Sequence, residues 1–479
     1  MTKVDVIVIG GGPGGYLAAE RAAQGGKAVV LIESHKLGGV CLNEGCIPSK
    51  TFLNSAKLYD YARGSADYGV ITKEASLDHQ QVLRRKEKVV NTLVGGVTAK
   101  LKNCGVKVIY GQGSIYEKTA DGIVVEVTHA VGKELDQAKD AEANTAQEMF
   151  LSDKVIIATG STPIIPPIPG LKEGVQEGFV ITNREIFELT KIPKTLVIIG
   201  GGVIGLEMAS YFAQAGTTVT VIEMAETIIP AFDQEISNAL LKELKKKGIN
   251  FFLSGQVTKV QHGADGQGGM VTYQKGEDSF TLAADYVLCA IGRKPVIEGI
   301  GLEKANIYTE KGAVVTDDQM RTNVSGIYAV GDVNEKYMLA HTAYREAEVA
   351  VNHILGKKDF MRYEAVPSVI YTYPEVACVG KTKEQAEMAG MSVKSITTSF
   401  KYSGRYLAEV DKGSGFCKII VDTKRDCIVG VHMIGSYVSE MVYGVTHMIE
   451  AQTLIEQIKE TIFPHPTVCE VIREALFEL

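Results

Sequence analysis

Two cysteines, Cys41 and Cys46, are separated by four residues in a segment (residues 38–50) that reads Gly-Gly-Val-Cys-Leu-Asn-Glu-Gly-Cys-Ile-Pro-Ser-Lys. Its glycines permit tight backbone turns around the two sulfurs. Pro48 suits the first turn of a helix, and a helix N-terminus near the Cys46 sulfur favours the thiolate. Because a disulfide in a reducing compartment is more often catalytic than structural, we interpret this cysteine segment as a redox-active dithiol.

The cysteine spacing has two other interpretations. The pair could be half of a zinc site, but such a site normally needs a second close pair of ligands, and the other six cysteines offer none. The pair could also be passive and buried. Lys50, the last residue of the segment, is either an exposed surface lysine or a cation placed close to the thiolate.

A histidine near the C-terminus is a candidate acid–base group. His465 lies between two prolines, and Glu470 follows five residues later. The prolines restrict the backbone, and a nearby carboxylate would orient the imidazole and raise its basicity. The alternative is a structural histidine in a proline-rich turn.

The cysteine segment follows a pattern typical of dinucleotide binding. Residues 4–9 are apolar and predict a buried parallel strand, and Gly10, Gly12 and Gly15 form a G-x-G-x-x-G loop before a helix. A second strand ends at Glu33, 23 residues after Gly10. Such glycines let the backbone approach a pyrophosphate at the helix N-terminus, and the acid binds ribose hydroxyls.

The same pattern occurs a second time, 190 residues later. Gly200, Gly202 and Gly205 form the glycine loop, and Glu223 ends the following strand, again 23 residues after the first glycine. Two such units imply two dinucleotides, or one dinucleotide and an electron partner of similar build. Strand–turn segments at 155–161 and 287–293 resemble each other, which indicates that the second unit is inserted into the first.

The chain is too long for one hydrophobic core. We expect an α/β protein with two Rossmann-like domains, the second inserted in the first, and a C-terminal α+β domain whose strands and helices are grouped separately. The predicted limits are 1–150 for the first nucleotide-binding domain, 151–284 for the second, 285–357 for a central domain that completes the first site, and 358–479 for the C-terminal domain.

Composition excludes some classes of function. The net charge of −7 over 479 residues disfavours nucleic acid as a partner, because phosphate binding needs a basic surface. No apolar run approaches the roughly 20 residues that span a bilayer. The N-terminus runs directly into the first strand without a charged-then-apolar leader, so we expect a cytoplasmic protein. We expect no metal ion.

Several motifs together resemble one family over essentially the whole chain. The strings GGGPGG, CLNEGCIPSK, GGGVIGLE, YAVGD, MLAH and HPTVCE occur in the order found in the pyridine nucleotide–disulfide oxidoreductases. The resemblance implies FAD in the first unit, NAD in the second, a redox disulfide between Cys41 and Cys46, and a homodimer built through the C-terminal domain.

The resemblance also implies roles for single residues. Cys41 would exchange with substrate, Cys46 would face the flavin, and Lys50 would lie near the flavin and pair with Glu207. His465, held by Glu470, would act as acid–base group from the other subunit. Asp332 would hold the ribityl and phosphate part of FAD, and Met338, Ala340 and His341 would lie against its ring. The remaining nucleotide-site candidates are Gly160, Gly292 and Val203.

Within the family, the chain is most similar to the members that oxidise protein-bound dihydrolipoamide with NAD⁺. The partner would be a lipoyl-bearing protein of a 2-oxoacid dehydrogenase complex or of a glycine cleavage system. Glu223 repels a 2′-phosphate and so favours NAD⁺ over NADP⁺. The chain lacks the C-terminal cysteine pair of mercuric reductases. A reductase of another disulfide and a non-enzymatic nucleotide-binding subunit are the alternatives.

Three positions depart from the family pattern. Phe463 stands where many relatives have a second histidine, Cys469 lies beside Glu470, and Glu44 places an acid between the redox cysteines. None of the three removes a residue that the implied mechanism needs.

Overall fold

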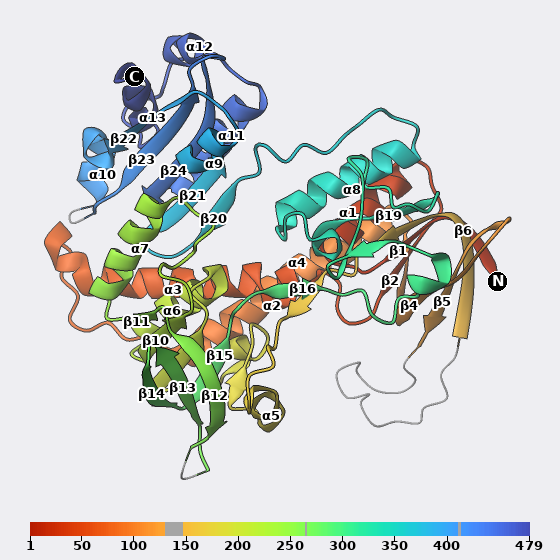
Figure 1. Cartoon of the computed structure of the whole chain (residues 1–479), viewed down its shortest axis with the longest axis horizontal. Coiled ribbons are helices and arrows are strands. Elements are labelled where there is room, and N and C mark those ends of the chain that lie inside the picture. Colours follow the sequence, from red (N-terminus) through yellow and green to blue (C-terminus); the bar gives the residue numbers. More distant parts are fainter. Residues whose placement is uncertain (130–146, 264–265, 411–412) are drawn as a thin grey trace. The chain divides into compact units, whose positions relative to one another are not determined.

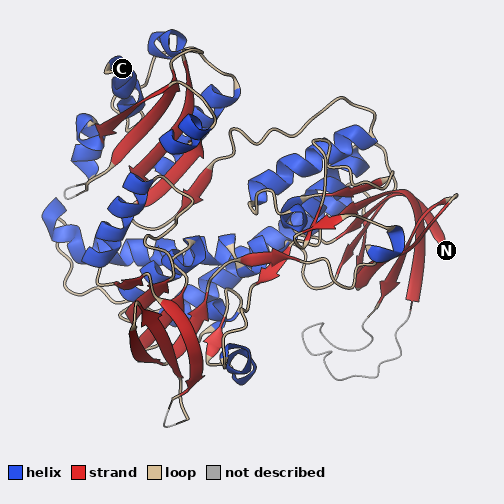
Figure 2. Ribbon diagram, in the orientation of Figure 1, coloured by secondary structure: helices blue, strands red, loops and turns tan. Residues whose placement is uncertain are grey.

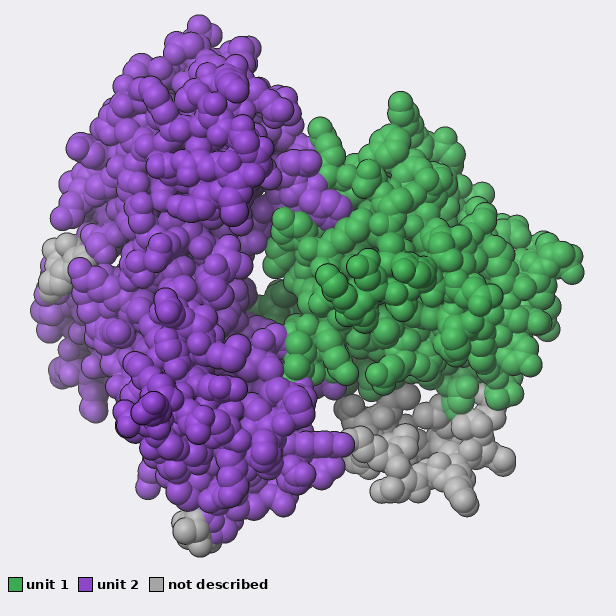
Figure 3. Space-filling model, in the orientation of Figure 1, with its two compact units in different colours: residues 1–48, 84–164, 293–362 green, residues 49–83, 165–292, 363–479 purple. Residues whose placement is uncertain are grey.

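The computed structural model describes residues 1–129, 147–263, 266–410 and 413–479. Its residues form two compact units, shown in Figure 3. Unit 1 comprises residues 1–48, 84–164 and 293–362, and unit 2 comprises residues 49–83, 165–292 and 363–479. The sequence of the charged, alanine-rich stretch 132–148 predicts a loop or a β-excursion, and most of this stretch lies outside the described residues.

Unit 1 is built on a seven-stranded sheet in the order β3-β2-β1-β6-β5-β4, with β19 also paired to β6. Its strands are β1 (Thr2–Ile9), β2 (Val29–Glu33), β3 (Lys107–Tyr110), β4 (Gln112–Thr119), β5 (Gly122–Thr128), β6 (Gln147–Ile157) and β19 (Ile327–Ala329). Strands β3, β2, β1, β6 and β19 pair in parallel, and β4 and β5 add antiparallel strands. Val6, Ile7, Val8 and Ile9 of β1 are buried, as its apolar run predicts.

Helices α1 and α8 pack against each other beside this sheet (Figure 1). The helices with residues in unit 1 are α1 (Pro13–Gln24), α2 (Gly39–Glu44), the start of α3 (Cys46–Gly64), most of α4 (His79–Asn103) and α8 (Ala340–Ile354). The sequence from about Leu77 to Lys102 predicts a long helix that is polar on one face, and helix α4 confirms this prediction. The unit also contains the short strands β7 (Ser161–Pro163), β16 (Arg293–Pro295), β17 (Thr309–Glu310) and β18 (Ala313–Val314).

The second glycine motif lies in a parallel sheet of unit 2, in the order β11-β10-β9-β15-β8. Its strands are β8 (Val180–Ile181), β9 (Thr195–Ile199), β10 (Thr218–Glu223), β11 (Asn250–Leu253) and β15 (Tyr286–Cys289), with helices α5 (Leu171–Glu177), α6 (Val203–Gln214) and α7 (Gln234–Lys246). An antiparallel sheet of β12 (Gln256–His262), β13 (Gly269–Lys275) and β14 (Asp278–Ala284) is part of the same insertion.

The C-terminal part of unit 2 is an antiparallel sheet with separate helices (Figure 2). The sheet order is β20-β21-β24-β23-β22. Its strands are β20 (Ser368–Ile370), β21 (Glu375–Gly380), β22 (Val393–Ser399), β23 (Phe416–Asp422) and β24 (Cys427–Gly435), and the helices are α9 (Lys383–Met388), α10 (Gly404–Glu409), α11 (Val438–Glu450), α12 (Ile455–Glu460) and α13 (Glu470–Phe477). The two nucleotide-type folds and this α+β part confirm the expected fold class.

Each of the two sheets includes a strand that extends past the expected domain limit at residue 150 or 284. Strand β6, which extends to Ile157, stays in the first sheet beside β1. Strand β15, over Tyr286–Cys289, stays in the second sheet beside β9. Local sequence shows that both segments are strands, but it does not show which sheet supplies their hydrogen-bonding partners. The domain limits themselves stay predictions.

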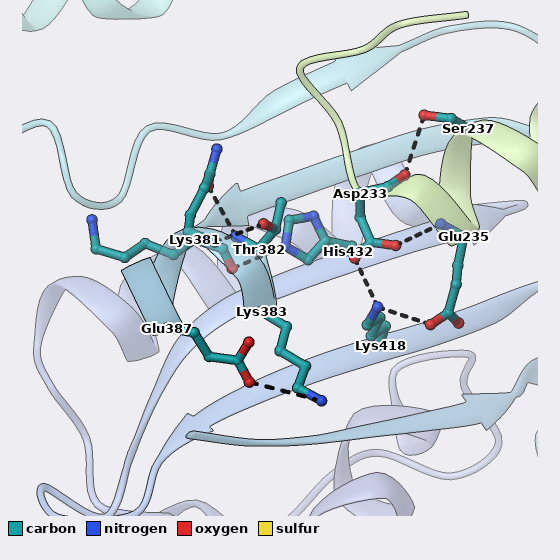
Figure 4. A network of polar contacts seen from close by, with 10 residues as sticks. Asp233, Glu235, Ser237, Lys381, Thr382, Lys383, Glu387, Lys418 and His432 are labelled. Carbon is teal, nitrogen blue, oxygen red and sulfur yellow. Dashed lines mark hydrogen bonds and ion pairs between the residues drawn. The ribbon is translucent and has the colours of Figure 1, made fainter. Parts of the chain in front are cut away.

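A buried ion pair joins helix α7 to the C-terminal sheet within unit 2 (Figure 4). The Lys418 side chain on β23 is 6% exposed, and its Nζ lies 2.8 Å from Asp233 Oδ2 and 2.9 Å from Glu235 Oε1. Asp233 also caps α7, because its carboxylate accepts a hydrogen bond from the Glu235 backbone N–H. Removing Lys418 or Asp233 would leave a buried charge without its partner, which costs about 3–5 kcal/mol.

Candidate functional site

The first glycine loop connects β1 to α1 with very little space between them. Gly10 has φ +104°, and a Cβ there would lie 2.2 Å from the carbonyl oxygen of Ala158. A Cβ on Gly15 would lie 1.8 Å from the carbonyl oxygen of Gly10. At Gly12, the N-cap of α1, a Cβ would meet only Gly39, at 3.8 Å. The protein's own packing thus requires glycine at the two outer positions but not at Gly12.

The second glycine loop, between β9 and α6, repeats this geometry. Gly200 has φ +108°, and a Cβ there would lie 2.5 Å from the Ala290 carbonyl oxygen. A Cβ on Gly205 would lie 2.3 Å from the Gly200 carbonyl oxygen, whereas one on Gly202 would meet nothing within 4 Å. Gly202, whose backbone is open, is the last residue before the N-terminus of α6. Both loops therefore fit a pyrophosphate placed against a helix N-terminus.

The acid at the end of each second strand holds its glycine loop. Glu33 accepts hydrogen bonds from the backbone N–H groups of Gly11 (2.7 Å) and His35 (2.6 Å). Glu223 accepts them from Gly201 (2.6 Å) and Ala225 (2.7 Å). A carboxylate has about four acceptor positions, so each can still bind ribose hydroxyls. Burial raises the pKa of Glu33, against the effect of its backbone hydrogen bonds.

The redox cysteines lie on two consecutive helices rather than in an irregular turn. Cys41 is in α2, and Cys46 is the first residue of α3. The Gly38 N–H donates to the Gly11 carbonyl oxygen over 2.9 Å, which ties the cysteine segment to the first glycine loop. Cys46 thus stands at a helix N-terminus, where the local field favours a thiolate.

Two tyrosines that sequence reasoning missed lie close to the cysteines. The hydroxyl groups of Tyr16 on α1 and Tyr344 on α8 are hydrogen-bonded to each other, and the ring centroids are 6.0 Å apart. Burial, then the Tyr344 hydrogen bond, and then the negative charges of Cys41 and Cys46 raise the pKa of Tyr16. The only local signal is that Tyr16 directly follows the glycine motif, because its partner is 328 residues away in the chain.

Asp332 lies in a polar cluster at the ends of the unit 1 strands. Its Oδ2 accepts from Ser161 Oγ over 2.5 Å, and Arg293 donates to the same Ser161 oxygen over 2.8 Å. This cluster connects three segments of the chain, just after Gly160 and Gly292 and within the 3₁₀ turn Gly331–Asn334. Among the other candidates, Met338 precedes helix α8, whereas Ala340 and His341 are its first two residues.

The expected ion pair between Lys50 and Glu207 is present in unit 2. Lys50 Nζ lies 3.1 and 3.0 Å from the two carboxylate oxygens of Glu207, whose side chain is only 4% exposed. Glu207 also accepts a hydrogen bond from the backbone N–H of Tyr371 over 3.0 Å. Lys50 lies on α3, one turn after Cys46, and Glu207 lies on α6, one turn after Val203.

His465 and Glu470 form the expected pair at the start of α13. The distance from His465 Nδ1 to Glu470 Oε1 is 2.9 Å, and the Thr467 backbone N–H donates to the other carboxylate oxygen over 2.9 Å. These two contacts, the Thr467 one first, lower the pKa of Glu470. The His465 side chain is 77% exposed, so its other ring nitrogen is available to a substrate or a partner.

Two further properties hold for the part of the chain that the structure describes. No group of three or more His, Cys, Asp or Glu side chains there gathers in a way that could hold a metal ion. The zinc interpretation of the cysteine pair therefore lacks further ligands within those residues. No helix in the described ranges is long and apolar enough to cross a membrane.

The contrast between Gly202 and Gly205 can be tested by single alanine substitutions. Gly202→Ala should change the free energy of unfolding by no more than about 1 kcal/mol but weaken NAD⁺ binding about tenfold or more, because the methyl group enters the pyrophosphate position. Gly205→Ala should destabilise the fold, since its Cβ would meet the Gly200 oxygen at 2.3 Å. Denaturant unfolding and NAD⁺ titration measure the two effects. Unchanged NAD⁺ affinity in Gly202→Ala would contradict the assignment.

Comparison with known proteins agrees with this geometry. Residues 4–347 match the pyridine nucleotide-disulphide oxidoreductase family, and residues 366–476 match the dimerisation domain of the same family. The chain is 39% identical to a dihydrolipoyl dehydrogenase of Bacillus subtilis, over 99% of this chain and 97% of that protein. It is 37% identical to the mitochondrial dihydrolipoyl dehydrogenase 2 of Arabidopsis thaliana, over 98% of this chain and 89% of that protein.

Solved structures with a similar fold cover the whole chain. LpdA of Mycobacterium tuberculosis has a TM-score of 0.88 at 25% identity, and covers 100% of this chain and 99% of its own. RclA of Escherichia coli, an HOCl-induced flavoprotein disulfide reductase determined as a Cu(II) complex, has a TM-score of 0.85 at 26% identity, with 100% of both chains covered. The chain belongs to the pyridine nucleotide-disulphide oxidoreductase family.

Proposed function

We propose that this oxidoreductase oxidises protein-bound dihydrolipoamide to lipoamide and reduces NAD⁺. The observation that carries the proposal is the dithiol segment at the α2–α3 junction, hydrogen-bonded to a glycine loop, in a chain whose full-length relatives are dihydrolipoyl dehydrogenases. A dithiol substrate is the natural partner of a protein disulfide, because both exchange by the same thiolate chemistry.

The residues present fit FAD in unit 1 and NAD in unit 2. The first glycine loop, with Glu33, Gly160, Asp332 and the start of α8, would hold FAD. The second loop, with Val203, Glu223 and Gly292, would hold NAD. When bound, FAD supplies the two-electron chemistry that links a dithiol to a nicotinamide. The open backbone at Gly12 and Gly202 supports both assignments.

The protein's own part of the reaction is thiol–disulfide exchange. We infer that Cys41 and Cys46 close into a disulfide in the oxidised enzyme. One substrate thiolate attacks Cys41 Sγ, which forms a mixed disulfide and releases Cys46 as a thiolate. The second substrate thiol then attacks the substrate sulfur of the mixed disulfide, closes the lipoyl ring and releases Cys41, whose sulfur takes up the proton of that thiol. Two electrons have then passed from the substrate to the protein dithiol.

His465 acts as the base in this exchange. Its imidazole accepts a proton from the substrate thiol, which becomes the attacking thiolate. Glu470 accepts the hydrogen bond from the Nδ1 side, so the Nε2 side is the one that can take the proton. We propose that His465 acts on the dithiol of the partner subunit, because the C-terminal residues match the family's dimerisation domain, which supports a homodimer.

The physiological partner would be a lipoyl-bearing protein of a 2-oxoacid dehydrogenase complex or of a glycine cleavage system. A flexible lipoyl-lysine arm carries the dithiol to Cys41. We propose a cytoplasmic location, because a disulfide in a reducing compartment is more often catalytic than structural, as we propose for Cys41 and Cys46.

A reductase of a different disulfide is the second candidate. The likeness to the flavoprotein disulfide reductase RclA, which is as complete as the likeness to LpdA, favours keeping it. It would use the same dithiol and the same dinucleotide loops but accept another substrate at Cys41.

A steady-state assay separates the two candidates. The FAD-loaded protein should reduce NAD⁺ with dihydrolipoamide as donor, much faster than it reduces NADP⁺, and should reduce glutathione disulfide slowly or not at all. Cys41→Ser is the matched control, because it removes the sulfur that meets the substrate and leaves both glycine loops intact. Turnover of another disulfide without turnover of dihydrolipoamide would overturn the proposal.

The role of the Glu470 carboxylate can be tested by substitution. Its lowered pKa keeps the carboxylate ionised over about pH 5–8, where imidazoles titrate. Glu470→Gln removes the ionised carboxylate that contacts His465 Nδ1. The plateau of kcat/KM should therefore fall about tenfold or more, because the ring is less well oriented.

The control is Glu474→Gln on the same helix, since Glu474 forms an ion pair with Arg473 and none with His465. A pH profile of Glu470→Gln that coincides with the wild-type profile would contradict the acid–base assignment.

A further inference from the structure

The segment between β10 and α7 (residues 224–232, called the connecting segment below) fixes the backbone of the second glycine loop. The Ile229 N–H donates to the Gly201 carbonyl oxygen over 3.0 Å, while the Gly201 N–H donates to Glu223 over 2.6 Å. Because a peptide group is planar, the bond to the Gly201 carbonyl also sets the direction of the Gly202 N–H. That N–H lies at the helix N-terminus assigned to the pyrophosphate.

Ile229 is held in a conformation that a β-branched residue rarely adopts. Its φ is +41°, and its side chain is buried. Such a backbone persists only where the surrounding structure fixes it. The Ile229 carbonyl oxygen accepts from the Phe232 N–H over 2.9 Å. Ser237 Oγ on α7 lies 3.4 Å from the same oxygen and 3.2 Å from the Asp233 carbonyl oxygen. The start of α7 therefore holds the strained residue in place.

Asp233 joins the start of α7 to the C-terminal sheet (Figure 4). Its Oδ1 accepts from the Glu235 N–H over 2.9 Å, and its Oδ2 accepts from the Lys418 ammonium over 2.8 Å. The Asp233 side chain is 1% exposed. One apolar cluster contains residues from the connecting segment, from α7 and from the C-terminal sheet, among them Ile228, Ile229, Ile236, Val376 and Ile434.

Building on the assignment of NAD to the second glycine loop, we propose that Lys418 is a positioning residue for NAD binding. It acts through Asp233 on the backbone at Gly201. Lys418 fixes the carboxylate of Asp233, and with it the first turn of α7. That turn keeps Ile229 in its strained conformation, and Ile229 orients the peptide between Gly201 and Gly202. A cation of the C-terminal sheet thereby sets the geometry of the pyrophosphate position.

A second ion pair on the same helix separates this role from simple attachment of α7. Lys247, the C-cap of α7, has its Nζ 3.0 Å from Asp60 Oδ2 on α3. The full length of the 13-residue helix lies between Lys247 and Asp233. If the Lys418 pair only fastened α7 to its surroundings, loss of either pair would affect NAD⁺ binding alike.

The experiment compares Asp233→Asn, Lys418→Met, the double variant of these two, and Lys247→Met in the oxidised, FAD-loaded protein. Asparagine still caps the helix, so Asp233→Asn removes the charge without removing the cap. Lys247→Met is the matched control. The affinity for NAD⁺ is measured by calorimetric titration without lipoyl substrate, and KM is measured separately for NAD⁺ and for dihydrolipoamide.

Asp233→Asn and Lys418→Met should each weaken NAD⁺ binding about two- to thirtyfold, the range found for residues that act on a site without touching its ligand. The KM for NAD⁺ should rise, and the KM for dihydrolipoamide should not change. The double variant should bind no more weakly than the weaker single variant, because both substitutions remove the same contact. Lys247→Met should bind NAD⁺ with the wild-type affinity.

Wild-type affinity in Asp233→Asn, or an equal loss in Lys247→Met, would overturn the positioning role and leave the proposed function standing. Additive losses in the double variant would overturn the route through Asp233. If Lys418→Met does not fold, Asp233→Asn and Lys247→Met still decide the role of the pair. Wild-type protein that binds NAD⁺ but does not oxidise dihydrolipoamide would overturn the substrate assignment alone.

Discussion

The close contact between a strand end and the following helix is the constraint on which both nucleotide units depend. In each unit the third glycine of the motif lies so near the carbonyl oxygen of the first that any side chain would collide with it. This contact brings the N-terminus of the helix to the carboxyl edge of the sheet. The middle glycine is then left open in front of that N-terminus, where a pyrophosphate binds favourably.

The dithiol depends on the same constraint. The cysteine segment is hydrogen-bonded to the first glycine loop through Gly38 and Gly11. Cys46 then begins α3, and the same helix carries Lys50 one turn later. The Lys50 ammonium contacts the Glu207 carboxylate and the face of the Tyr371 ring within unit 2.

Much of the fold could be predicted because its signals are local. The glycine loops, the acids at the strand ends and the helix over residues 79–103 follow from spacing and periodicity. Helix α2 was not predicted, because a six-residue helix flanked by glycines resembles a turn in sequence. Strands β21 and β22 do not alternate strictly between apolar and polar residues, so the sequence does not predict them as strands. The sheet that β6 and β15 join depends on distant partners, which local sequence does not encode.

The candidate site shows the same division. The pairs Lys50–Glu207 and His465–Glu470 were expected and are present as contacts, although the roles assigned to them stay predictions. Tyr16, Tyr344 and Tyr371 were not expected. These tyrosines contact residues that are distant in the sequence, as in the hydrogen bond between Tyr16 and Tyr344. The residues next to each tyrosine in the sequence do not predict these contacts.

The central claim is that electrons enter the protein through Cys41 and Cys46. The most direct measurement is anaerobic reduction of the FAD-loaded protein with one equivalent of dihydrolipoamide, followed by alkylation and peptide mass spectrometry. Cys41 and Cys46 should both become alkylated only after reduction, and the labelling of the other cysteines should not change. Equal labelling of the two cysteines before and after reduction, or new labelling elsewhere in the chain, would contradict the claim.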